Sequence, residues 1–175
     1  MAVKTQNILT AMYDVVEERN GIHVQFQGDR EMALFHDYSE YSCVVDAVIA
    51  GLKIIDAVKG YQVSVGVGQS FGRMFAAKIG ARGEKDNILL GRTVGEADKN
   101  EDEYADKNQL VLSADLYEKL KQKNSSLSSL FKKKDGDVYY TDLGYHGYLT
   151  QESRKQLKHD NANNNYNKAW GTFVD

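Results

Sequence analysis

Residues 23–35 carry the sequence His-Val-Gln-Phe-Gln-Gly-Asp-Arg-Glu-Met-Ala-Leu-Phe. Apolar and polar residues alternate in its first part, which is typical of a half-buried strand, and an apolar run closes it. Between the two parts, Gly28 suits the first central position of a type II′ turn, which matches the twist of paired strands. The stretch therefore predicts a tight β-hairpin with the carboxylate of Asp29 and the guanidinium of Arg30 at its tip.

The predicted hairpin tip carries a carboxylate that could bind a metal ion. A solvent-exposed carboxylate on a rigid strand end is suited to a Mg²⁺ ion that carries nucleotide phosphates. Asp29 is therefore a candidate ligand, and Arg30 stands beside it, able to contact either Glu31 or a substrate phosphate. An ordinary Gly-Asp turn without any ligand is the alternative that the hairpin alone leaves open.

Length and composition narrow the class of protein. The 175 residues suit one domain, and 42% hydrophobic with 27% charged residues is an ordinary globular composition. A net charge of −3 predicts no nucleic-acid partner. We find neither an apolar run of about 20 residues nor a signal-peptide pattern, so we expect no membrane association. The single cysteine, Cys43, cannot form an internal disulfide, and we expect a cytoplasmic protein.

The chain outside the hairpin predicts a series of helices and strands. In the first half we expect an amphipathic helix over 4–18, an enclosed apolar helix over 39–58, a strand over 61–68, an irregular segment over 69–83 and a short apolar segment over 86–91. In the second half we expect a polar helix over 92–105, a strand over 109–113, a helix over 115–122, a solvated loop over 123–134 and a terminal hairpin over 138–149. Ser113 or Asp115 can cap the helix over 115–122. Residues 1–150 then form the folded domain and residues 151–175 a polar tail.

This order of elements predicts an α+β protein whose mostly antiparallel sheet carries helices on one side. It resembles a ferredoxin-like, or palm, βαββαβ unit in which the first strand is apparently absent, because a helix opens the chain.

Three stretches resemble motifs of one enzyme family, the class III adenylate/guanylate cyclase catalytic domain. Residues 28–35, Gly-Asp-Arg-Glu-Met-Ala-Leu-Phe, resemble its metal-binding hairpin. Residues 63–68 followed by 79–83 resemble its strand pair, and residues 91–99, Gly-Arg-Thr-Val-Gly-Glu-Ala-Asp-Lys, resemble its nucleotide-binding helix. Each motif is weak alone, but the three at this spacing are fairly specific. The resemblance covers roughly residues 4–120.

Finer features resemble the bacterial pyrimidine cyclases of Pycsar antiphage defence. They are Arg30 directly after the metal Asp, the run 82–86 (Arg-Gly-Glu-Lys-Asp), the pair Gly91-Arg92, and Lys99 where most of the family has Arg. The resemblance implies a lyase that converts UTP or CTP to the 3′,5′-cyclic nucleotide and pyrophosphate as an antiphage second messenger.

The resemblance also implies roles for individual residues. Asp29 matches a ligand of two Mg²⁺ or Mn²⁺ ions, with Gly28 beside it in the nucleotide-binding hairpin. Lys99 matches the basic residue that stabilises charge on the α-phosphate, although Lys lacks the bidentate fork of Arg. Arg30 is assigned a catalytic contact with the phosphates.

Three other nucleotide-binding positions depart from the purine cyclases. Gly95 stands where most of the family has a ribose-orienting Asn. Gln25 and Ile88 stand where adenylyl cyclases read adenine, and neither matches. Gln25 offers a donor and an acceptor to a base edge, so ATP is disfavoured as the substrate.

The family resemblance also identifies a missing part. In that family, a strand with the second metal Asp precedes the helix that begins here at Lys4. Its absence would leave unpaired backbone groups in the sheet. Three explanations are open: a piece of the protein outside this sequence supplies the strand; residues 171–175, Gly-Thr-Phe-Val-Asp, supply it in a permuted or swapped arrangement; or the protein is a degenerate cyclase.

The resemblance implies a homodimer whose active sites are composite, with Asp29 from one chain and Lys99 from the other. One alternative is an inactive cyclase-homology domain that dimerises or binds a nucleotide. A second is an unrelated two-metal palm domain of the nucleotide-polymerase type.

Overall fold

The computed structural model describes residues 2–36, 42–81, 83 and 85–156. Its elements are, in chain order, α1 (Ala2–Glu18), β1 (Ile22–Gln27), β2 (Arg30–Leu34), α2 (Cys43–Lys59), β3 (Val67–Gln69), β4 (Phe75–Ile79), β5 (Asp86–Leu90), α3 (Arg92–Lys99), the π-helix η1 (Asn100–Tyr104), β6 (Leu110–Ser113), α4 (Ala114–Lys123), α5 (Ser125–Ser128), β7 (Lys132–Lys134) and β8 (Val138–Thr141). Residues 145–156 are also helical. This mixture confirms the predicted α+β class.

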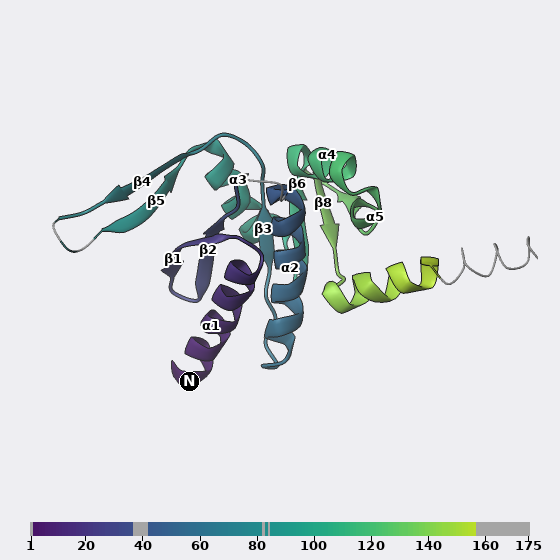
Figure 1. Cartoon of the computed structure of the whole chain (residues 1–175), viewed down its shortest axis with the longest axis horizontal. Helices are drawn as coiled ribbons and strands as arrows, with labels where there is room; N and C mark the ends of the chain where they lie inside the picture. Colours follow the sequence, from purple (N-terminus) through teal and green to yellow (C-terminus); the bar gives the residue numbers. More distant parts are fainter. Residues whose placement is uncertain (1, 37–41, 82, 84, 157–175) are drawn as a thin grey trace, which may run out of the picture.

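The strands form three separate sheets in the described part of the chain. The largest has the order β3-β6-β8-β7, with β3 parallel to β6 and the other pairs antiparallel. The hairpins β1–β2 and β4–β5 each form a two-stranded sheet. Figure 1 shows α2 packed in front of the central strands, with α1 beside it beneath the hairpin β1–β2. Among the residues that the structure describes, no ladder joins β2 to β3.

The core lies between α2 and the central sheet. Leu52 and Ile55 of α2 and Leu110 and Leu112 of β6 are completely buried. A helix that is apolar over most of its circumference is covered on more than one side, and α2 packs against both the sheet and α1. The predicted enclosed helix is therefore confirmed from Cys43 onward, while residues 39–41 lie outside the described part of the chain.

The hairpin at 23–35 forms as predicted. Gln27 pairs with Arg30, which leaves two residues in the turn. Gly28 has a φ of 66°, and Asp29 does not share this positive φ, as a type II′ turn requires. The register slips between His23 and Gln25, where a β-bulge redirects the side chains of β1.

The strand predicted over 61–68 is wrong for most of its length, because β3 begins only at Val67. Gln62 has a left-handed φ of 58°, which ends α2 in a turn. Val65 then bonds to the turn residue Asn108 rather than to a strand. Val63, Val65 and Val67 do alternate with other residues, but the parallel pairing with β6 begins only at Val67, opposite Leu110.

Residues 69–83 are not irregular throughout, since β4 and β5 form a long antiparallel arm. Figure 1 shows this arm projecting away from the rest of the molecule. More than half of the surface of Phe75, Ile79 and Leu90 is exposed. The arm lacks the apolar–polar alternation of a half-buried strand because each of its strands is exposed at both ends and only partly buried in the middle.

The segment predicted as a solvated loop over 123–134 contains α5 and β7 instead. Asn124 caps α5 by accepting a hydrogen bond from the Leu127 backbone N–H, 2.9 Å away. Leu127, Leu130 and Phe131 are buried in the main core. The sequence analysis gave more weight to the serines and lysines of this segment than to these three core residues.

The terminal hairpin predicted over 138–149 is also wrong. β8 pairs with β6 and β7, so it has no need of a following strand. The chain instead turns into the helix of residues 145–156, near whose start the backbone N–H of His146 donates to Asp56 of α2 at 2.8 Å. This helix runs across residue 150, where the sequence analysis places the start of the tail.

The remaining elements follow the predictions closely. α1, β6 and α4 match the expected segments within two residues. Ser113 is the N-cap of α4, accepting from the Leu116 N–H at 3.3 Å. The polar helix predicted over 92–105 divides into α3 and η1, because the chain adopts π-helical winding from Asn100.

Candidate functional site

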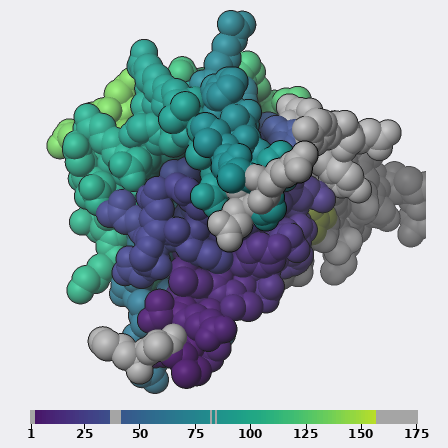
Figure 2. Space-filling model, turned by 90° about the vertical axis from the view of Figure 1, so that its left-hand side faces the viewer, coloured from purple at the N-terminus to yellow at the C-terminus, as the bar shows by residue number. Residues whose placement is uncertain are grey.

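The tip of the β1–β2 hairpin lies against α3 and η1. Nη1 of Arg30 is 3.3 Å from Oδ1 of Asp98 and 3.2 Å from Oε2 of Glu101, and Nη2 is 2.5 Å from Oδ1 of Asp102. Figure 2 shows the blue-violet hairpin between purple α1 and the green-teal segment that contains α3 and η1. One guanidinium therefore joins the hairpin to a helix about 70 residues later in the chain. The sequence predicts either Glu31 or a substrate phosphate as the partner of Arg30, and the structure pairs Arg30 with these three carboxylates instead of with Glu31.

Negative charges outnumber positive ones around the guanidinium of Arg30. The hydrogen bond to Asp102, followed by attraction to Glu101, raises the pKa of Arg30. Burial raises the pKa of Glu101, attraction to Arg30 lowers it, and the negative charges of Asp102, Asp98 and Asp29 raise it further. Asp29 is therefore close enough to act on the same group, and carboxylates outnumber cations at this end of the hairpin.

Lys99 lies on the same helical stretch but has different partners. Its Nζ is 3.6 Å from Oε2 of Glu103 and 5.6 Å from the ring centroid of Tyr104. The negative charge of Glu103 raises the pKa of Lys99. About half of the side chain is exposed, so it is accessible to a second molecule. Among the described residues of one chain, no hydrogen bond or ion pair joins Lys99 to Asp29 or Arg30.

The other predicted nucleotide-binding residues occupy two places. A Cβ atom added at Gly95 would meet no heavy atom within 4 Å, so α3 faces open space there. Gln25 lies on β1 and Ile88 on β5, and these two strands lie against each other. The fold thus brings the strands of the two base-reading positions together, while Gly28 and Asp29 lie in the turn that directly follows β1.

The structure shows one polar pair near the hairpin that the sequence analysis missed. His23 Nδ1 is 3.1 Å from Oε1 of Glu31, and the His23 ring lies between the rings of Tyr13 and Phe26. The Glu31 side chain is 2% exposed, and its Oε2 has no hydrogen-bond partner. Burial raises the pKa of Glu31, and His23 opposes this shift. The bulge in β1 breaks the simple alternation from which this pairing could have been predicted.

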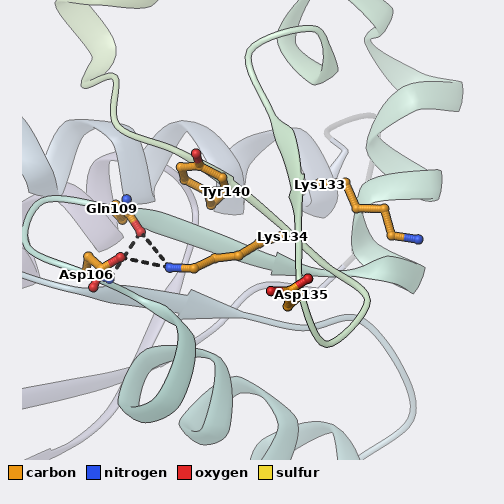
Figure 3. A pocket seen from close by; sticks show the side chains of 6 residues that line it. All are labelled: Asp106, Gln109, Lys133, Lys134, Asp135 and Tyr140. Atoms are coloured by element: carbon orange, nitrogen blue, oxygen red, sulfur yellow. Dashed lines mark hydrogen bonds and ion pairs between the residues drawn. The ribbon is translucent and has the colours of Figure 1, made fainter.

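A surface cavity of about 420 Å³ lies elsewhere, between the η1–β6 loop and β7. Figure 3 shows Lys134 extended toward Asp106 and Gln109, with Nζ 2.8 Å from Oδ2 of Asp106. The same ammonium donates to the carbonyl of Tyr104 at 2.8 Å. Because its central cation is already neutralised and bonded, we interpret this cavity as a structural junction.

The described residues do not form a complete metal centre. No group of three His, Cys, Asp or Glu side chains among them is arranged to hold a metal ion. Asp29 alone is a single carboxylate, and Asp98, Glu101 and Asp102 are engaged by Arg30. Two closely spaced Mg²⁺ or Mn²⁺ ions would need further oxygen ligands.

Sequence comparison finds no protein-family model and no curated protein that matches this chain. Within the residues that the structure describes, no helix has the length and apolar character to cross a membrane.

Structure comparison, in contrast, finds nucleotidyl cyclases. The adenylyl cyclase CyaB from P. aeruginosa is similar with a TM-score of 0.64 and 19% identity, over 79% of this chain and 80% of the other. The guanylate cyclase domain of RhGC from Catenaria anguillulae, solved with GTP, has a TM-score of 0.65 and 17% identity over 77% and 79%. The dimeric guanylyl cyclase domain of RhoGC from Blastocladiella emersonii has a TM-score of 0.69 and 15% identity over 81% and 82%. The chain therefore has the fold of adenylyl and guanylyl cyclase domains.

Proposed function

We propose that this chain is a nucleotidyl cyclase that acts on a pyrimidine nucleoside triphosphate. The observation that carries the proposal is the position of Asp29 at the tip of a confirmed type II′ hairpin in a chain with the cyclase fold. In the reaction, the ribose 3′-oxygen forms a bond to the α-phosphorus. The bond from that phosphorus to the bridging oxygen breaks, and pyrophosphate leaves.

The polar side chains are assigned complementary roles. Asp29 contributes one carboxylate toward the Mg²⁺ or Mn²⁺ that accompanies the triphosphate, and a two-ion site would need further oxygen ligands beside it. Lys99 supplies a cation to the charge that develops on the α-phosphate. Arg30 is already bonded to three carboxylates, so we assign it a positioning role, which holds Asp29 in place against η1.

We propose a homodimer because no hydrogen bond or ion pair among the described residues joins Asp29 to Lys99, which pairs with Glu103 instead. The β4–β5 arm exposes Phe75, Ile79 and Leu90, and an isolated two-stranded hairpin is only marginally stable in water. A second copy would cover this arm and place its own Lys99 opposite Asp29. The solved RhoGC domain forms a non-canonical dimer, which supports dimerisation of a chain with this fold.

The choice of a pyrimidine rests on Gln25 and Ile88, whose strands lie against each other. An amide and an aliphatic side chain can bind a small base edge through one donor, one acceptor and apolar contact. We therefore propose UTP or CTP as the substrate, and cyclic UMP or cyclic CMP as the product. The resemblance to Pycsar cyclases extends the proposal to antiphage signalling.

Pyrophosphate release from each triphosphate in the presence of Mn²⁺ tests the roles of the two residues. We expect Asp29→Asn and Lys99→Ala each to lower the rate at least tenfold, and an equimolar mixture of the two variants to recover part of it through mixed dimers. Asp135→Asn, at a site remote from the hairpin, serves as the matched control and should keep the full rate. Equal rates for Asp29→Asn and Asp135→Asn would contradict the assignment.

Two observations favour a second candidate function, an inactive cyclase-homology domain. The described residues form no complete set of metal ligands, and Gly95 has no side chain to contact a ribose. An inactive cyclase-homology domain would bind a nucleotide, or dimerise, without turnover. Calorimetric titration with UTP, CTP, ATP and GTP separates the two functions, since binding without pyrophosphate release would favour the inactive domain.

A further inference from the structure

Lys99, to which the proposed reaction assigns the α-phosphate, has an aromatic neighbour on the π-helix that follows it. Its Nζ lies 5.6 Å from the centroid of the Tyr104 ring, within the distance at which a ring face attracts an ammonium. The spacing from 99 to 104 is that of a π-helical hydrogen bond, whereas side chains on an α-helix meet at three and four positions. The change to π-helical winding at Asn100 therefore brings this ring beside the cation.

The turn between β7 and β8 supports the Tyr104 ring. Gly136 of this turn has a φ of 85°, which favours glycine. A Cβ atom added there would lie 2.6 Å from Cε1 and from the hydroxyl oxygen of Tyr104, closer than real Cβ atoms approach other heavy atoms. The ring therefore rests directly on the backbone of Gly136, and this position has no room for a side chain.

The backbone of Tyr104 is held by the same hairpin. Lys134 of β7 donates from Nζ to the Tyr104 carbonyl at 2.8 Å and to Oδ2 of Asp106 at 2.8 Å. Figure 3 shows Lys134 extended along this junction toward Asp106 and Gln109. The hairpin thus contacts both the side chain and the carbonyl of a residue 30 positions earlier than Lys134, and it fixes the end of η1.

Tyr104 is not a core residue. It is only half-buried, and among the described residues it belongs to neither of the two buried hydrophobic clusters. The Lys99 side chain beside it is about half exposed. A lysine ammonium is a point charge on a flexible stem and lacks the rigid fork of Arg, so its position depends on the groups around it.

We infer that Tyr104 is a positioning residue, which holds the ammonium of Lys99 where the proposed reaction needs it. The β7–β8 turn holds Tyr104 in its place. The role of Lys99 in the reaction rests on the proposed function, whereas the contact between the two side chains does not. Without the ring, the Lys99 stem would sample more rotamers and would have to be ordered when the triphosphate binds. A ring without a hydroxyl still attracts an ammonium, so phenylalanine should replace Tyr104.

Competitive acetylation of the full chain, read by mass spectrometry without nucleotide, tests the contact independently of activity. Only the neutral amine is acetylated, and the ring stabilises the charged form. We therefore expect Tyr104→Leu to speed acetylation of Lys99 at least threefold and Tyr104→Phe to leave it within twofold. Gly136→Ala, which displaces the ring without removing it, should have the same effect as Tyr104→Leu. Tyr145→Leu is the matched control, because Lys53 lies 5.5 Å from the Tyr145 ring, and it should speed acetylation of Lys53 but not of Lys99.

Cyclase kinetics test the consequence for the reaction. We expect Tyr104→Leu to lower kcat at least fivefold and to leave KM within twofold, because the cation of Lys99 acts on charge that develops in the transition state. Tyr104→Phe should keep the wild-type kcat, which a role of the hydroxyl would not allow.

Three results would overturn the inference. One is equal acetylation of Lys99 in the wild type and in a folded Tyr104→Leu chain. Another is acetylation of Lys99 in the unaltered chain at the rate of the exposed Lys107, which decides whether or not the variants fold. The third is an unchanged kcat in Tyr104→Leu. The expected acetylation in a chain that forms no cyclic nucleotide would instead support the contact and contradict the proposed function.

Discussion

Nη2 of Arg30 lies 2.5 Å from Oδ1 of Asp102, and this ion pair joins residues 72 positions apart in the chain. It connects the turn that carries Asp29 to the π-helix that continues from Lys99. The pair therefore couples the two parts of the proposed site within one chain, although Asp29 and Lys99 have separate surroundings.

Removing this cation should loosen the hairpin. We expect Arg30→Gln to lower the free energy of unfolding by about 1 kcal/mol, because exposed ion pairs contribute little singly and more in a network. The loss should shrink in high salt, which screens the wild-type attraction. Urea denaturation at low and high salt measures both effects. Arg92→Gln is the control, since Arg92 is 91% exposed and pairs with Glu96 on its own helix, and an equal loss there would contradict the coupling.

Two glycines near α3 should respond in opposite ways to the same substitution. Gly95→Ala should raise the free energy of unfolding by about 0.5–1 kcal/mol, because Ala is the better helix former and the space is open. Gly68→Ala should lower it by about 1–3 kcal/mol, because the new Cβ would meet backbone atoms of Ala97 and Glu101 at 2.3 Å. Thermal denaturation of both variants compares them, and a stabilised Gly68→Ala would show that β3 and α3 are not in contact.

The buried carboxyl of Glu31 should make stability depend on pH. Its pKa is raised in the folded state. At a pH between the unfolded and the folded pKa, the folded chain therefore keeps a proton on Glu31 that the unfolded chain has lost. Stability from this group is therefore present at low pH and lost as pH rises through that window.

Glu31→Gln, which keeps a polar partner for His23, should abolish this decrease and be the more stable protein at neutral pH. Urea denaturation across the pH range measures it against the wild type, with the exposed Glu118→Gln as the control. A wild-type curve that rises with pH where the Glu31→Gln curve is flat would refute the assignment.

The hairpin could be predicted from sequence because its turn and its register depend on neighbouring residues. The same holds for α1, α4 and the N-cap at Ser113. The partners of Arg30 could not be predicted in this way, because Asp98, Glu101 and Asp102 reach it only through the packing of two distant elements.

The failures share a physical cause, which is that local patterns do not reveal what covers a segment. The strands of the β4–β5 arm are exposed at both ends and only partly buried in the middle, so they lack the expected alternation. The sequence predicts the first residues of the helix 145–156 as the bend and the returning strand of a hairpin, because glycines favour turns and aromatic residues such as Tyr148 favour strands. Tyr145 and Tyr148 instead pack against the main core.

The most direct test of the proposed function is the identity of the product. The purified full-length chain is incubated with an equimolar mixture of ATP, GTP, CTP and UTP and with Mn²⁺, and cyclic nucleotides are identified by chromatography and mass spectrometry. We predict cyclic UMP or cyclic CMP in at least tenfold excess over cyclic AMP and cyclic GMP, and none from Asp29→Asn. A folded chain that forms no cyclic nucleotide from any of the four would contradict the cyclase function, and a purine product in excess would contradict the proposed substrate.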